Sequence, residues 1–170
     1  MSTLVYRLSL KNFLSHWWVL SIYVVFLIGV PLYFWQRLGA ESVAFAVVGA
    51  SIWFLLSFVP LVVLHLRYVV ESTGVVLIYD TVTRKLIYRR GNDSCEFFVS
   101  EIAAIESTKT PSLRKGSLLW YPWDSSCFAV IQLRSGKKLL ITSLVVPRLR
   151  WPFSFPNETV HEAIFCWPKQ

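Results

Sequence analysis

Two long uncharged apolar stretches constrain the fold of this chain more than any other feature. Residues 13–35 read FLSHWWVLSIYVVFLIGVPLYFW, and residues 43–66 read VAFAVVGASIWFLLSFVPLVVLHL, with no Asp, Glu, Lys or Arg in either. Because a helix rises about 1.5 Å per residue, each stretch can cross the roughly 30 Å hydrocarbon layer of a bilayer. The short link QRLGAES between them favours a tight turn. The sequence therefore predicts an antiparallel two-helix transmembrane hairpin.

Basic residues near the ends of the two stretches predict the orientation of the hairpin. The link holds only Arg37, which is balanced by Glu41, whereas several basic residues lie just outside the stretches: Arg7, Lys11, Arg67, Arg84, Lys85, Arg89 and Arg90. Loops rich in Lys and Arg usually stay in the cytoplasm. We therefore expect both termini to be cytoplasmic, which in a bacterium makes this a multi-pass protein of the inner membrane.

The charge and the cysteines narrow the class of partner. The net charge is +7, from 17 basic and 10 acidic residues, but no polybasic block is present. This argues against nucleic acid and favours the anionic surface of a bilayer as a partner. Cys95, Cys127 and Cys166 are odd in number and lack the spacing of metal ligands, so we expect free thiols, no metal site and no cofactor.

After Leu66 the pattern changes to short alternating segments separated by turn residues. The segments expected as strands are Val75–Tyr79, Lys85–Arg90, Cys95–Ser100, Ile102–Ser107, Phe128–Arg134 and Lys137–Ser143. Asn157-Glu158-Thr159 is expected to cap a final helix that reaches Cys166. The chain thus divides into an N-terminal segment with the hairpin, residues 1–67, and a domain at 68–170. The expected fold is a membrane hairpin followed by a small antiparallel sheet, or partly open barrel, with a C-terminal helix.

Two parts of this second region resemble a known family. The hairpin that turns at Asp80–Arg84, within IYDTVTRKLIYRRG, and the segment SGKKLLITSLVVP at Ser135–Pro147 resemble the PH-like domains of small bacterial membrane proteins. In those proteins two transmembrane helices precede a cytoplasmic PH-like sheet. The resemblance covers both apolar stretches and residues from about Tyr68 to Pro147, and it implies a binding or scaffold module. The segment Thr110–Ser126 departs from it, since it is long and aromatic.

Catalytic motifs are absent from the sequence, and we expect no enzymatic activity. Three groups of residues are candidates for binding instead. The aromatic residues Trp120, Tyr121 and Trp123 are candidates for contact with a protein partner; alternatively they cover one end of the barrel or rest on the bilayer. Arg84, Lys85, Arg89, Arg90, Lys137 and Lys138 are candidates for anionic lipid, or alternatively a solvated rim. Ser42, Ala46 and Ala50 form a stripe of small residues for helix packing, either within the hairpin or in an oligomer.

These features predict a non-enzymatic membrane-anchored interaction protein that binds another protein at or in the inner membrane. An alternative is an immunity protein that neutralises a membrane-targeted toxin. A second alternative is a module that senses anionic lipid. A homo-oligomer is compatible with all three.

Overall fold

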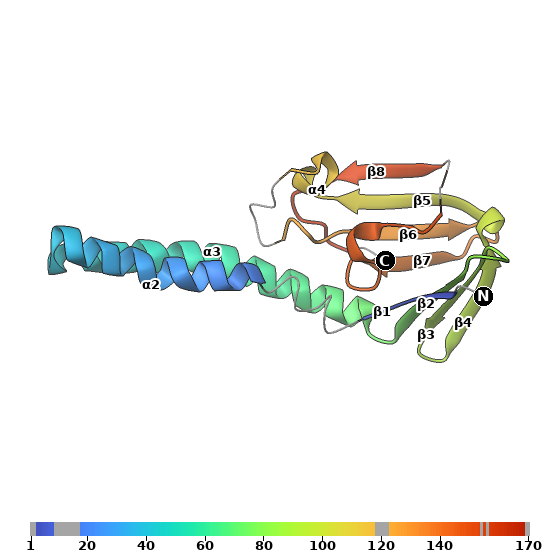
Figure 1. The fold of residues 1–170 in the computed structure, drawn as a ribbon, viewed down its shortest axis with the longest axis horizontal. Helices are drawn as coiled ribbons and strands as arrows, with labels where there is room; N and C mark the ends of the chain where they lie inside the picture. The colour runs from blue at the N-terminus through green and yellow to red at the C-terminus, as the bar shows by residue number, and fades with distance from the viewer. Residues whose placement is uncertain (1–2, 9–17, 118–122, 154, 156, 169–170) are drawn as a thin grey trace.

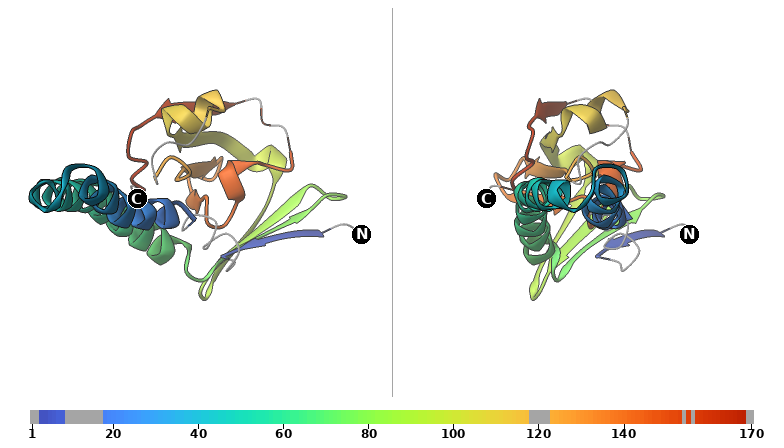
Figure 2. Two further views of the ribbon diagram at one scale, coloured as in Figure 1. Left: turned by 60° about the vertical axis from the view of Figure 1, so that its left-hand side comes forward. Right: turned by 90° about the vertical axis from the view of Figure 1, so that its left-hand side faces the viewer.

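A helical hairpin and two β-sheets make up the structure of the chain (Figure 1). The structure is a computed structural model, which describes residues 3–8, 18–117, 123–153, 155 and 157–168. Side chains are not described for a few helical residues, namely 18–20, 22–23, 38 and 40–42. The hairpin extends from one side of the sheets as a long rod, and its second helix continues into them (Figures 1 and 2).

The rod consists of helices α2 (Trp18–Leu38) and α3 (Ala40–Ser72), which lie antiparallel against each other. Gly39 joins them with a φ of 84°, a conformation that glycine adopts without steric cost. The rings of Phe26 and Trp53, at similar distances from this turn, lie 5.9 Å apart. Among the described residues, Val43–Ser72 is long and apolar enough to cross a membrane, and a shorter apolar stretch covers Val24–Arg37. By length and composition, therefore, one candidate span is found where the sequence predicts two.

One face of α3 is covered along its whole length. Half-buried residues recur on it where α2 lies beside it, at Val43, Ala46, Ala50 and Phe54. The same helical spacing continues with buried residues beyond the end of α2, at Ser57, Leu61, Leu64 and Tyr68. Ala46 and Ala50 are thus placed for packing within the hairpin, while the side chain of Ser42 lies outside the described ones. One helix face packs first on α2 and then on the β domain.

Helix α3 ends at Ser72, six residues beyond the expected end of the second span and past the expected domain boundary. The hydroxyl of Thr73 donates to the carbonyl of Val69 at 2.7 Å, and Gly74, with a φ of 75°, turns the chain into the first sheet. Only two residues, Thr73 and Gly74, therefore lie between α3 and the first sheet.

The first sheet is antiparallel, in the order β1-β2-β3-β4. Its strands are β1 (Thr3–Arg7), β2 (Val75–Asp80), β3 (Lys85–Arg90) and β4 (Asp93–Phe98). The turn expected at Asp80–Arg84 is present, with the Asp80 carboxylate accepting from the Val82 N–H at 3.0 Å and the Thr83 hydroxyl at 2.8 Å. The sequence predicts that Thr3–Arg7 belongs to the segment that precedes the domain. The structure instead pairs β1 with β2, so the helical hairpin is inserted between two neighbouring strands.

The second sheet has the order β7-β6-β5-β8 and is mixed. It comprises β5 (Ile102–Lys109), β6 (Phe128–Leu133), β7 (Lys138–Thr142) and β8 (Glu158–Glu162), with short helices η1 (Val99–Glu101), α4 (Pro111–Lys115) and η2 (Pro147–Leu149) at its connections. The predicted C-terminal helix is wrong: its first residues form β8, which runs parallel to β5. Thr159 and Val160 are β-branched and favour a strand, and the edge of β5 offers backbone partners that a short isolated helix lacks.

The two sheets pack face to face over one core. Alternate residues of each strand point inward, including Leu77, Leu86, Ile105, Ile131 and Ile141, all at most 1% exposed. The expected small β domain is therefore confirmed, as two packed four-stranded sheets. In place of a C-terminal helix, the last turns of α3 pack against β7.

Candidate functional site at the end of helix α3

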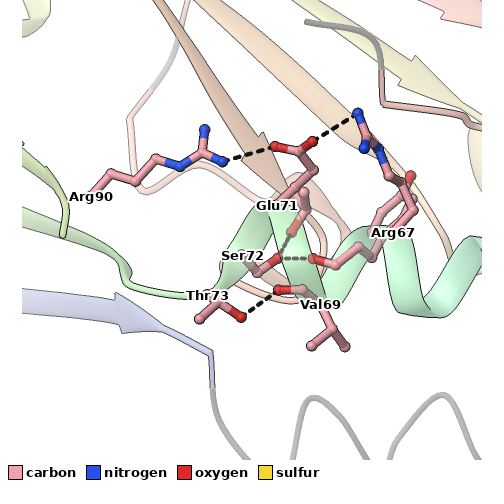
Figure 3. Close-up of polar contacts among 8 residues, drawn as sticks. Arg67, Val69, Glu71, Ser72, Thr73 and Arg90 are labelled. Atoms are coloured by element: carbon pink, nitrogen blue, oxygen red, sulfur yellow. Dashed lines mark hydrogen bonds and ion pairs between the residues drawn. The ribbon is translucent and has the colours of Figure 1, made fainter.

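A buried carboxylate joins the end of α3 to the first sheet (Figure 3). Glu71 is 2% exposed, and its two oxygens lie 3.0 Å from Nη2 of Arg67 on the same helix and 3.0 Å from Nη2 of Arg90 on β3. Both guanidinium groups remain partly open to solvent. A buried charge is tolerated only when it is paired and hydrogen-bonded, so Glu71 holds the helix and the sheet in one arrangement.

Further hydrogen bonds fix the same turn of α3 to the second sheet. The Ser72 hydroxyl donates to the Tyr68 carbonyl at 2.6 Å, so the 2.5 Å contact between the Ser72 and Thr142 hydroxyls has Thr142 as its donor. The Tyr68 hydroxyl donates to the carbonyl of Cys166 at 2.7 Å. Around these bonds Leu64 and Tyr68 pack with Trp123 and Leu144. The end of α3 is therefore part of the domain core.

A groove of about 610 Å³ lies beside this junction, which is within the usual size of ligand sites. Residues two apart on neighbouring strands line it: Glu106 and Thr108, Phe128 and Val130, Lys138 and Leu140. They alternate with the core residues of the same strands, so they lie on the outer face of the second sheet. Tyr88, Arg90, Asp93 and Ser94 from the first sheet line the groove as well.

The chemistry of the groove is mixed. Phe128, Val130 and Leu140 supply apolar surface, and the lining also holds three cationic side chains and two carboxylates: Arg90, Lys137, Lys138, Asp93 and Glu106. Burial raises the pKa of Tyr88 above its ordinary value, so the phenol stays neutral well into the alkaline range. An apolar surface with side chains of both charges suits a polypeptide better than it suits a simple anion.

The structure separates the six basic residues expected to bind anionic lipid. Arg90, Lys137 and Lys138 share the groove. Lys85 begins β3, about 17 Å from Arg90 at the usual rise of a strand, and Arg84 precedes it in the turn. Lys85 forms an ion pair with Glu96 at 2.6 Å, and Arg89 points to the opposite face of β3 from Arg90. The six residues therefore do not form one surface.

Of the three aromatic candidates, the structure describes only Trp123. Trp120 and Tyr121 lie outside the described residues. Trp123 is 8% exposed, and its ring centroid lies 4.9 Å from that of Phe165. It packs against α3 in the cluster described above, which corresponds to the alternative in which this residue covers one end of the domain. A contact of Trp123 with a protein partner would need this packing to open.

Reactive groups are few in the described part of the chain. No cluster of three or more His, Cys, Asp or Glu residues suited to a metal ion occurs among the described residues. Cys127 and Cys166 are buried, and burial raises the pKa of each thiol to about 12. Such thiols are poor nucleophiles at neutral pH.

Glu71 was not singled out from the sequence. It follows Arg67 by four residues at the end of an apolar stretch, and this spacing is the signal that indicates an ion pair on one helix face. Its pairing with Arg90, by contrast, depends on how β3 returns to the helix, which no local pattern shows.

In a comparison with known families, a family model described as PH domain matches residues 5–150. The matched range begins in β1, includes both helices of the hairpin and ends just after η2. Searches among curated proteins and among solved structures gave no match.

Proposed function

Because this chain belongs to the PH domain family, whose members are generally non-catalytic interaction modules, we propose that it is a non-enzymatic, membrane-anchored binding protein. In this proposal the hairpin spans the bacterial inner membrane and holds the PH domain on its cytoplasmic side. The domain then binds another protein at the membrane surface.

The continuity of α3 is the observation that carries this proposal. Its first part exposes large apolar side chains such as Phe45, Ile52 and Leu56, at a cost that a bilayer would remove. Its last turns are buried in the domain and bonded to both sheets. Since α2 has 21 residues, about 32 Å of helix, the hairpin matches one bilayer thickness, and the remaining turns of α3 extend into the domain.

The groove is the candidate contact with the protein partner. It lies beside the fixed end of α3, so a bound segment would be held at a defined position relative to the membrane. The immunity role stays a proposal of the same kind, in which the partner is a membrane-targeted toxin. The lipid-sensing role is not proposed for the six basic residues named from the sequence, because they lie on separate surfaces.

Site-specific photo-crosslinking in cells tests the proposal. A photoreactive residue at Ser94, in the groove, is expected to capture a partner protein, while the same residue at Val82, 72% exposed at the far end of the first sheet, is the matched control. A product of twice the chain mass at Ser94 would identify a second copy as the partner. Equal products from both positions, or no product from Ser94, would contradict a binding role for the groove.

A further inference from the structure

A second pocket lies at the hairpin end of the domain. It has a volume of about 300 Å³ and is formed between α4, the end of β5 and η2. Its polar lining consists of Lys109, Arg148, Arg150, Ser112 and Ser117. None of its lining residues carries a carboxylate, which distinguishes it from the groove beside Arg90.

The positive charge of this pocket is only partly compensated. Lys109 lies 3.4 Å from Glu158, a carboxylate that also accepts from the Ser107 hydroxyl at 2.8 Å. Arg148 and Arg150 are exposed, and neither forms an ion pair with a described residue. On α4, Arg114 pairs with Glu162 at 2.8 Å. Two guanidinium groups are thus available, and guanidinium is the group best suited to hydrogen-bond phosphate oxygens.

The backbone on both sides of the pocket is fixed. The Thr110 hydroxyl accepts from the Leu113 N–H at 3.3 Å and donates to the Asp124 carbonyl at 2.7 Å, which anchors the start of α4. On the other side, Arg148 has a φ of 53°, a left-handed conformation that is uncommon for a non-glycine residue. The Leu149 N–H donates to the Val146 carbonyl at 3.0 Å and holds this turn. The pocket is therefore formed before any ligand arrives.

The position of the pocket indicates where its ligand would come from. In Figures 1 and 2, α4 lies at the end of the domain from which the hairpin extends. If the hairpin spans a bilayer, this end faces the lipid headgroups, where phosphate is abundant. Soluble phosphate compounds have the same chemistry and would reach the pocket from the other direction.

We propose that this pocket binds a phosphate group, with Arg148 and Arg150 as its principal donors and the Ser112 and Ser117 hydroxyls completing the contacts. The inference goes beyond the protein-binding role. It uses none of the groove residues, so either proposal can fail without the other.

Native mass spectrometry of the detergent-solubilised full chain tests this proposal, with phosphatidylglycerol in one titration and inorganic phosphate in another. The double variant Arg148→Gln/Arg150→Gln is compared with Arg84→Gln/Arg89→Gln, which removes the same charge from the first sheet. We expect the pocket variant to weaken binding about tenfold or more, because hydrogen bonds to charged groups are the strong ones, and the control to change it by less than about twofold. If the double variant has a lower melting temperature than the unmodified chain, Arg150→Gln alone replaces it in the test, because Arg150 has an ordinary backbone conformation.

The two titrations distinguish a lipid headgroup from a soluble phosphate compound, and the variants distinguish a specific site from a general effect of charge. Binding of phosphatidylglycerol alone, with loss in the pocket variant, identifies a lipid headgroup as the source of the phosphate. Binding of inorganic phosphate with the same loss identifies a soluble ligand. Equal weakening in both double variants would show a general effect of net charge and overturn the site, as would unchanged binding in the pocket variant.

Discussion

Glu71 on α3 and Arg90 on β3 lie 19 residues apart in the sequence and are joined by an ion pair of 3.0 Å. Beside them, the Gly91 N–H donates to the Gly74 carbonyl at 3.3 Å, so the end of β3 lies against the end of the helix. Arg90 also lines the groove. A ligand bound in the groove would therefore contact Arg90, whose ion pair with Glu71 holds the end of α3 against the first sheet.

Replacing Glu71 with Gln should lower the free energy of unfolding by about 2–3 kcal/mol. When both partners of an ion pair are fully buried, removing one of them lowers the free energy of unfolding by more than this. Here the loss is smaller because both arginines are partly exposed and can be solvated by water. Chemical unfolding of the detergent-solubilised chain measures the difference. Lys85→Gln, which breaks the solvent-exposed pair with Glu96, is the control and should change the free energy of unfolding much less than Glu71→Gln does. Equal effects of the two changes would show that Glu71 has no special role.

Trp123→Ala should lower the stability of the domain by about 3–5 kcal/mol, as other large-to-small changes in a core do. The indole packs on Leu64, Tyr68 and Leu144, so its loss leaves a cavity between α3 and the domain. Melting and partner binding are measured on the same variant. If the variant keeps its melting temperature but loses partner binding, Trp123 is a contact residue and not part of the core.

Cys127 and Cys166 should resist alkylation in the native protein at pH 8. Both are buried with a pKa raised to about 12, so the reactive thiolate is scarce at this pH, while Cys95 is half-buried and is expected to react first. Mass spectrometry after iodoacetamide treatment counts the modified thiols, and unfolding in guanidinium should expose all three. Rapid native labelling of Cys166 would contradict the packing of the C-terminal segment against Tyr68.

Local sequence patterns were sufficient to predict most strands of the β domain. The alternation in Val75–Tyr79 and Lys85–Arg90, with a turn-forming Asp80 between them, predicts the β2–β3 hairpin because strand, turn and register are all encoded within a few residues. The Phe128–Arg134 and Lys137–Ser143 segments predict β6 and β7 for the same reason. The family match over residues 5–150 supports the PH-like fold that the resemblance implied.

Features that depend on distant segments were not predicted. β1 finds its partner β2 on the far side of the whole helical hairpin, and β8 pairs with β5 about 50 residues earlier. Asn157-Glu158-Thr159 contains the residue types of a helix cap, yet the open edge of β5 decides the outcome. The candidate sites likewise depend on contacts between segments far apart in the sequence, which local patterns do not predict. Arg148 and Arg150 meet Lys109 only because η2 folds back onto α4, and Arg84 is separated from Arg90 by the length of a strand.

We propose that the hairpin crosses a membrane and holds the PH domain in the cytoplasm. The most direct measurement fuses a reporter that is active only in the cytoplasm after Gln170 in one protein and into the turn at Gly39 in another. The excess of basic residues outside the apolar stretches predicts activity for the fusion after Gln170 and none for the fusion at Gly39. Activity at both positions would contradict a membrane-spanning hairpin, and activity at Gly39 alone would place the domain on the opposite side.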